Sequence, residues 1–144
     1  MRPHPYLRAY MAGIVVPTCF LLVIVSALVW FHLYLEVPTQ FAFNIPMRPL
    51  ERAIVFPMAV VPNLWGVWNM LHLALRSRTR LSLGVHGAVL PLLLMPAGVI
   101  LARTLDVFTI QWGFALPAAP IGVAVYYLVW KYIVGFLNDE IGVG

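Results

Sequence analysis

The sequence predicts an all-α integral membrane protein in which four transmembrane helices form a single bundle. The first observation is composition: of the 144 residues, 62% are hydrophobic and only 10% are charged, whereas a soluble domain carries about 25% charged residues. The second is the mean hydropathy of +0.92. The third is spacing, because four apolar runs, each long enough to cross about 30 Å of hydrocarbon, occupy residues 11–35, 53–76, 81–102 and 113–137.

Composition also narrows the classes of function. The net charge of +4 comes from scarce charges at the ends of the apolar runs. Nucleic-acid binding needs a clustered basic face, so we expect no nucleic-acid partner. The single cysteine, Cys19, excludes an intramolecular disulfide, and the apolar run around it predicts a small buried side chain.

The first apolar run is predicted to be a helix of the mature protein, because it lacks the small-residue cleavage site of a signal peptide. Pro17 is expected to kink this helix or to lie in its first turns. His32 and Glu36, four residues apart, are expected to pair at its end. Residues 36–51 contain three prolines mixed with polar and apolar residues, which predicts an irregular loop at the membrane interface.

The second apolar run has two faces when it is wound as a helix at about 100° per residue. One face offers hydrogen-bonding groups, and the other offers small residues for close helix contact. The polar face consists of Trp65, Asn69, His72 and Arg76, and the small face of Ala59, Asn63, Gly66, Met70 and Ala74. We expect the polar face to point into the bundle, where its indole, amide and imidazole form one network, because unpaired polar groups in hydrocarbon are costly.

The third run repeats this pattern, with His86 on one face and Gly84, Gly87 and Gly98 on another. We expect the small faces of the second and third runs to pack together, or against the small residues of the fourth run, Ala115, Ala118, Ala119 and Gly122.

The second and third runs each contain two prolines at the same spacing, Pro57/Pro62 and Pro91/Pro96. Two interpretations stay open: paired kinks open a pocket between the helices, or the prolines reflect their ordinary frequency in transmembrane helices. Between the two runs, residues 76–80 (RSRTR) are the densest positive cluster and predict a short hairpin connection.

The orientation follows from lysine and arginine alone. With the amino terminus in the cytoplasm, six of the nine cations, including the cluster at residues 76–80, lie inside and three lie outside. Residues 103–112 are then a polar link on the outside, and residues 138–144 are a short acidic tail on the inside. We therefore expect both termini in the cytoplasm, in a bacterial-type inner membrane or a plasma membrane.

No catalytic residues are predicted. The serines have no supporting base and acid, and the sequence contains no phosphate-cradling loop, no CxxC pair and no dinucleotide fingerprint. All five acidic residues lie outside the apolar runs. The sequence therefore argues against an enzyme with a carboxylate centre in the membrane.

His72 and His86 lie at similar distances from the hairpin connection, on neighbouring helices. Two interpretations stay open. The two imidazoles hold haem b between them, as in other helical bundles, or each histidine forms a hydrogen bond with a backbone carbonyl or with Asn69. No metal site is predicted, because a third ligand at that level is missing.

The candidate residues for binding a ligand or a partner are those with polar groups inside the two central runs: Trp65, Asn69, His72, His86 and Asn63. Asn63 follows Pro62, which frees a backbone carbonyl about one turn earlier. Its amide therefore bonds that carbonyl, a neighbouring helix or a ligand. We expect the variant Asn69→Leu to fold normally and to bind the ligand or partner of the protein with lower affinity.

Residues 62–72, PNLWGVWNMLH, resemble the aromatic W/F-G-x-V-W run of the tryptophan-rich sensory proteins of the translocator family, which bind porphyrins and sterols. The resemblance covers this run alone. That family has five spans and this chain is predicted to have four, so the ligand of that family is not carried over to this chain.

The leading hypothesis is a small non-catalytic membrane protein. Its surroundings are the lipid bilayer. In one version of the hypothesis, the protein is an accessory or structural subunit that binds another membrane subunit or a second copy of the chain. In the other version, it binds an apolar ligand within the bundle. Glycine and alanine faces on three predicted helices motivate this hypothesis, which needs no cofactor. The alternative is a membrane electron-transfer protein that holds haem b through His72 and His86.

Overall fold

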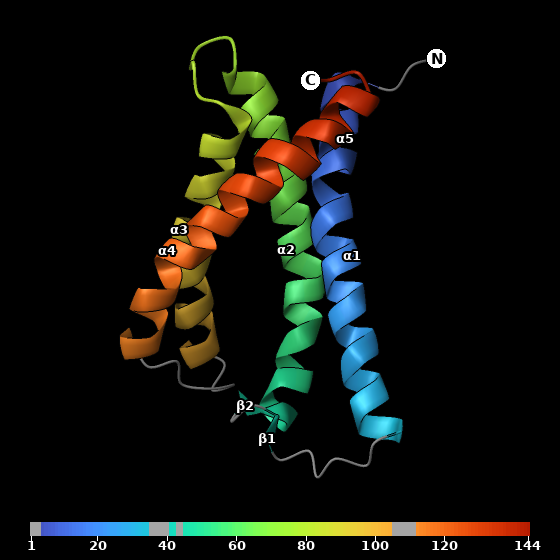
Figure 1. Cartoon of the computed structure of the whole chain (residues 1–144), viewed down its shortest axis with the longest axis vertical. Helices are drawn as coiled ribbons and strands as arrows, with labels where there is room; N and C mark the ends of the chain where they lie inside the picture. Colours follow the sequence, from blue (N-terminus) through green and yellow to red (C-terminus); the bar gives the residue numbers. More distant parts are fainter. Residues whose placement is uncertain (1–3, 35–40, 43–44, 105–111) are drawn as a thin grey trace.

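The computed structural model describes residues 4–34, 41–42, 45–104 and 112–144, and it is helical throughout apart from one very short strand pair. The first helices are α1 (Pro5–Tyr34), α2 (Met47–Leu75) and α3 (Leu83–Thr104). The antiparallel strands β1 (Phe41–Ala42) and β2 (Ile45–Pro46) precede α2. The chain ends with α4 (Trp112–Leu128), a π-helix η1 (Val129–Val134) and α5 (Gly135–Glu140). These last three follow one another without a break and form one long rod, which we call the C-terminal rod (Figure 1).

Three stretches of the described helices are long and apolar enough to cross a membrane: Pro5–Ala27, Leu83–Ile100 and Ala119–Glu140. Few of their residues are buried within the chain, and large apolar side chains such as Phe20, Ile100 and Ile121 are exposed. Exposed apolar surface of this extent is typical of helices that face lipid. The chain is therefore a helical protein with membrane-spanning helices, as the sequence predicts.

Two helices begin earlier than the sequence predicts. α1 begins at Pro5 and not at residue 11, because proline is well suited to the first helical position, where its missing N–H has no partner to lose. α2 begins at Met47 and not at residue 53. The last part of the expected irregular loop, residues 36–51, is therefore helical, and Pro49 lies in the first turn of α2, where proline is tolerated.

Some predictions fall outside the described residues. The first is the structure of the part of the expected interfacial loop that precedes β1. The others are the pairing of His32 with Glu36 and most of the polar link at residues 103–112. At the other end of the chain, the expected tail at residues 138–144 is helical as far as Glu140.

The helices pack as two pairs that the C-terminal rod joins. α1 packs along α2 and α3 along α4, whereas α2 and α3 contact each other over a much shorter stretch. The rod runs obliquely, so that α4 lies beside α3 while α5 reaches α1 (Figure 1). The start of α1, the connection between α2 and α3, and the C-terminus all lie at the same end of the molecule (Figure 1). We call this the terminal end.

Glycines bring α1 and α2 into backbone contact. A Cβ atom on Gly13 would lie 2.6 Å from the carbonyl oxygen of Trp65 and 2.8 Å from Cα of Gly66, and one on Gly66 would lie 2.5 Å from the ring of Tyr10. Separations this short leave no room for a side chain, so the two backbones approach closely only because both positions are glycine. The small face of the second helix therefore packs on α1, and the prediction that its neighbour is the third or fourth helix is wrong.

The glycines of α3 pack mainly against the C-terminal rod, which is one of the two neighbours predicted for them. A Cβ on Gly87 would lie 2.0 Å from Cγ of Trp130, and one on Gly122 of α4 would lie 2.8 Å from Met95 of α3. Large side chains therefore fill the space above each glycine, and the two small faces do not meet directly. Gly98 differs, because a Cβ there would meet nothing within 4 Å.

The π-helix η1 keeps one side of the C-terminal rod in contact with successive neighbours. A π-helix holds more residues per turn than an α-helix, because its hydrogen bonds join residues five apart. Trp130 and Val134, four residues apart, are both fully buried. Asn138, four residues further on, is buried as well. The wider turn therefore aligns these side chains along one stripe, which lies against α3 first and then against α1 and α2.

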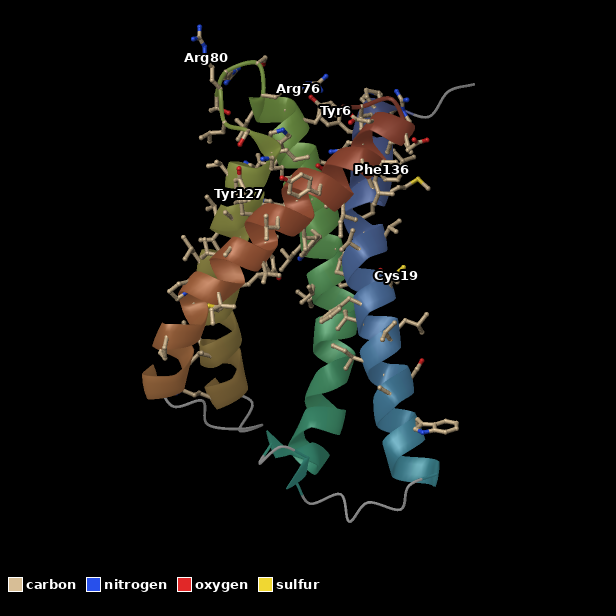
Figure 2. All side chains as sticks on the ribbon, in the orientation of Figure 1. Tyr6, Cys19, Arg76, Arg80, Tyr127 and Phe136 are labelled. Atoms are coloured by element: carbon tan, nitrogen blue, oxygen red, sulfur yellow. The ribbon has the colours of Figure 1, made fainter. Side chains whose placement is uncertain are left out.

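The apolar core lies where three of these elements meet. It consists of Trp65 from α2, Leu90 from α3, and Trp130 and Val134 from η1. Cys19 is exposed, which corrects the expectation that it is buried. Figure 2 shows the reason: Cys19 lies on the side of α1 that points away from the other helices. An apolar run in a membrane helix does not distinguish the side facing lipid from the side facing protein, since both are apolar.

Candidate functional site

Two residues of the predicted polar face of α2, Trp65 and Asn69, point into the molecule, where the C-terminal rod covers them. The ring centroid of Trp65 lies 5.0 Å from that of Tyr126 and 5.2 Å from that of Trp130. One turn closer to the terminal end, Asn69 contacts α5. Arg76, at the end of this face, contacts the C-terminal tail. The inward direction that the sequence predicts is therefore observed for Trp65 and Asn69, whereas His72 is half-buried and Arg76 is exposed.

Asn69 and Asn138 form a buried amide pair. Nδ2 of Asn69 donates to Oδ1 of Asn138 at 2.7 Å, and Nδ2 of Asn138 donates to Oδ1 of Asn69 at 3.1 Å. Nδ2 of Asn69 also donates to the carbonyl oxygen of Ala9 at 2.7 Å. Asn69 is 1% exposed and Asn138 is 6% exposed. The pair ties α2 to α5 and α1, so Asn69 has no surface left for a ligand, which was the role expected of it.

Trp68 and His86 form a second reciprocal pair, between α2 and α3. Nε1 of Trp68 donates to the carbonyl oxygen of His86 at 2.9 Å, and Nε2 of His86 donates to the carbonyl oxygen of Trp68 at 3.1 Å. The two rings are stacked, with centroids 4.8 Å apart. For His86, this contact matches the interpretation in which the imidazole bonds a backbone carbonyl.

His72 lies beside this pair. Its ring centroid is 4.9 Å from that of His86, with an angle of 53° between the ring planes. Two axial imidazoles on opposite sides of a haem have centroids about 6 Å apart, since each metal–nitrogen bond is about 2 Å long. His86 is also stacked on Trp68, and its Nε2 already serves as a donor. The arrangement of these residues therefore does not fit a haem between the two histidines.

The indoles of the core are held by ring packing. Nε1 of Trp65 and Nε1 of Trp130 are buried and have no hydrogen-bond partner among the described residues. The ring of Tyr126 packs against that of Trp65, with an angle of 55° between the ring planes. The network expected to join Trp65, Asn69 and His72 is therefore not formed, because Asn69 turns its amide toward Asn138.

Asn63 joins α2 to α1. The hydroxyl of Tyr10 donates to Oδ1 of Asn63. This contact corresponds to one of the predicted alternatives, in which the amide bonds a neighbouring helix. In the described part of the chain, no three histidine, cysteine or acidic side chains gather closely enough to hold a metal ion.

Two arginines hold the C-terminal tail against the two N-terminal helices. Arg8 of α1 donates to the carbonyl oxygen of Ile141, and Nη1 of Arg76 donates to that of Val143 at 2.8 Å. Figure 2 shows Arg76 at the terminal end, beside this tail. The residues expected to form a simple acidic tail are therefore part of the packing between α1, α2 and α5.

A glycine turn shapes the tail for these contacts. The N–H of Gly142 donates to the carbonyl of Asp139 at 3.0 Å, and the N–H of Val143 donates to that of Asn138 at 2.8 Å. Gly142 has φ 67°. This is the Schellman arrangement, which ends a helix with a left-handed residue and satisfies its last carbonyls.

The structure brings four of the five predicted site residues together in two groups, and Asn63 lies apart from them at the contact with α1. Trp65 and Asn69 lie against the C-terminal rod, whereas His72 and His86 lie together between α2 and α3. Sequence reasoning missed their partners Trp68, Trp130 and Asn138. A signal for Trp68 was present, because it precedes His72 by four residues and so shares its side of the helix. No local pattern distinguished Asn138 from an exposed tail residue.

Comparisons of the chain with models of known families, with curated proteins and with solved structures give no match.

Proposed function

We propose that the protein is a non-catalytic four-helix membrane protein that serves as an accessory subunit of a larger membrane complex. The observation that carries this proposal is how the polar groups are used. The amides of Asn69 and Asn138 and the imidazole of His86 are engaged within the chain. Three membrane-spanning stretches, in contrast, leave most of their residues open to the surroundings. The surface available for a partner is therefore apolar helix.

The positions of the chain ends and of the charges support a bundle with α2 as the fourth span and both termini in the cytoplasm. Helix α1 starts and the chain ends at the terminal end (Figure 1), which supports an even number of crossings. The connection with Arg78 and Arg80 lies at the same end, while Arg103 lies at the other end of α3. By the positive-inside rule, the terminal end faces the cytoplasm.

Gly98 supports a partner helix more specifically. Pro96, Ala97 and Gly98 on α3 are exposed, and a Cβ on Gly98 would meet nothing within 4 Å. Small residues allow helices in a membrane to approach closely, and van der Waals packing drives their association. The surface around Gly98 is therefore suited to another subunit.

Purification from native membranes in a mild detergent tests the subunit proposal. Native mass spectrometry is expected to find the chain in a complex of fixed stoichiometry. Gly98→Phe is expected to release it without unfolding it, whereas Cys19→Phe, at another exposed position, is expected to leave the complex intact. A monomer without a partner would contradict the subunit proposal. If that monomer carried a stoichiometric lipid-like molecule, the result would favour binding of an apolar ligand as the function of the protein.

Cysteine labelling tests the topology. In a Cys19→Ser background, Ser77→Cys is placed in the exposed connection at the terminal end, and Gln40→Cys in the segment between α1 and α2. A membrane-impermeant maleimide is expected to label position 40 from outside and position 77 only after the cytoplasmic face is opened. Equal labelling of both positions from one side would overturn the four-span arrangement.

A further inference from the structure

Lys131 is a cation on the exposed side of η1. Its Nζ lies 5.7 Å from the ring centroid of Tyr127 and 5.1 Å from that of Tyr132. Lys131 and Tyr132 are exposed. These neutral rings hold the ammonium group in place without cancelling its charge. The acidic residues Asp139 and Glu140 lie on α5, about two turns further along the rod.

The packing of η1 on α3 places this cation beside the first turn of α3, which directly follows the basic connection. A Cβ on Gly84 would lie 2.9 Å from the ring of Tyr127 and 3.1 Å from Cβ of Lys131. Gly84 is the second residue of α3, and the preceding connection carries the exposed Arg78 and Arg80. Arg80 and Tyr127 lie on the same side of the molecule (Figure 2). We call Lys131, Tyr127, Tyr132, Arg78 and Arg80 the Lys131 corner.

We propose that the Lys131 corner binds the headgroup of an anionic phospholipid, with Lys131 contacting the phosphate. This inference rests on the membrane placement given under Proposed function. Three cations suit a headgroup that carries a net negative charge, and each cation near the membrane surface adds attraction to such lipids. Tyrosine side chains, such as those of Tyr127 and Tyr132, are enriched at the membrane–water interface, where the lipid headgroups lie.

Exposed leucines on the same two helices suit the acyl chains of the same lipid. Leu92 of α3 and Leu128 of α4 are exposed, and they lie further from the basic connection on the same pair of helices. A phospholipid whose phosphate is at Lys131 therefore has its acyl chains alongside this surface. A soluble anion would use the cations but not these leucines, so the surface favours a lipid.

Native mass spectrometry of the purified full-length chain tests this proposal. The protein is reconstituted in vesicles of phosphatidylcholine mixed equally with phosphatidylglycerol, and the lipids retained after release are counted. Wild type is expected to retain phosphatidylglycerol in preference to phosphatidylcholine. Lys131→Gln is expected to lower this preference about fivefold, whereas Lys131→Arg is expected to keep it. Arg103→Gln, at the other end of α3, removes the same charge and is the matched control.

Equal retention of both lipids by wild type would overturn the proposal. The same loss in Arg103→Gln as in Lys131→Gln would also overturn it, because the attraction would then be a diffuse effect of net charge. Displacement of the lipid by inorganic phosphate would show a soluble-anion site instead. The test uses the isolated chain and vesicles with both leaflets alike, so its outcome is independent of any partner subunit and of the orientation in the cell. Circular dichroism of each variant confirms that the exposed substitutions leave the fold intact.

Discussion

At the scale of single residues, the buried amide pair of Asn69 and Asn138 makes the stability of the protein sensitive to one side chain. At Asn69, the amide and its partner Asn138 are both buried, so the free energy of the pair depends on the presence of both side chains. A hydrogen bond between membrane helices contributes only about 0.6 kcal/mol on average, but a buried amide left without its partner costs about 1–3 kcal/mol. The asymmetry makes this pair a sensitive point for stability.

Asn69→Leu is therefore expected to lower the free energy of unfolding by about 1–3 kcal/mol, because it leaves the amide of Asn138 buried and unpaired. The double change Asn69→Leu with Asn138→Leu is expected to be more stable than the single change, since both polar groups are then removed together. Thermal unfolding in detergent, followed by circular dichroism, measures both. Unchanged melting of Asn69→Leu would argue against the buried pair.

Two glycines of α3 provide a second test with an internal control. Gly87→Ala is expected to destabilise the protein by about 1–3 kcal/mol, as overpacking does, because the new Cβ would lie 2.0 Å from Cγ of Trp130. Gly98→Ala has open space around the new atom, so it is expected to be neutral or to stabilise α3 by up to about 1 kcal/mol. The same thermal unfolding assay compares them, and an equal effect at both positions would contradict the packing of Trp130 on Gly87.

Among the elements, the C-terminal rod has the largest structural role, because it contacts both helix pairs. α4 and η1 lie on α3, while α5 lies on α1. The tail beyond α5 adds contacts to Arg8 and Arg76. The rod depends on two local departures from α-helical geometry, the π-helix η1 and the left-handed Gly142. Each redirects the chain so that buried groups find partners on other helices.

Gly142→Ala is expected to weaken the closing turn by about 1–2 kcal/mol, which is the cost of a left-handed conformation for a residue with a Cβ. Gly142→Asn is expected to cost less, because asparagine adopts this conformation more readily. Hydrogen exchange of the Val143 and Gly144 amides, both bonded to the carbonyl of Asn138, reads out the turn. Exchange of these amides in Gly142→Ala at the wild-type rate would show that the turn does not depend on glycine.

At the scale of the whole molecule, the polar contacts gather toward the terminal end. The Asn69–Asn138 pair, the Trp68–His86 pair and the tail contacts of Arg8 and Arg76 all hold different helices together there. In total, α2 and α3 make few contacts with each other. A molecule organised in this way uses these polar groups to hold its helices together and leaves apolar helix surfaces exposed.

The contact between the two histidines predicts the colour of the protein. Protein purified from cells supplied with ample haem is expected to show no Soret band, because the rings of His72 and His86 are 4.9 Å apart and leave no gap for a porphyrin. An absorption spectrum of the purified chain checks this. A Soret band that disappears in both His72→Ala and His86→Ala would instead establish the electron-transfer alternative.

The amino-acid sequence by itself determined the class of protein and the positions of its helices. Composition and the length of the apolar runs depend only on neighbouring residues and on the thickness of a bilayer. The same local information placed Trp65 and Asn69 on an inward-facing side of α2, because helical periodicity follows from backbone geometry. The predicted starts of α1 and α2, residues 11 and 53, were each six residues too late, because the helices begin at Pro5 and Met47. Prolines are compatible with the first turn of a helix, so they did not mark the boundary.

Only the tertiary structure decided which groups these faces meet. Gly66 packs on Tyr10 and Gly13 of α1, and Asn69 bonds Asn138, a residue far along the chain that the sequence assigns to a tail. Apolar faces of membrane helices resemble one another, so their sequences do not specify which helix lies against which. The choice depends on shape at each crossing, and at Asn138 it depends on the π-helix η1, which directs this amide toward α2. That is the physical reason why the candidate ligand site at Asn69 became a contact between helices.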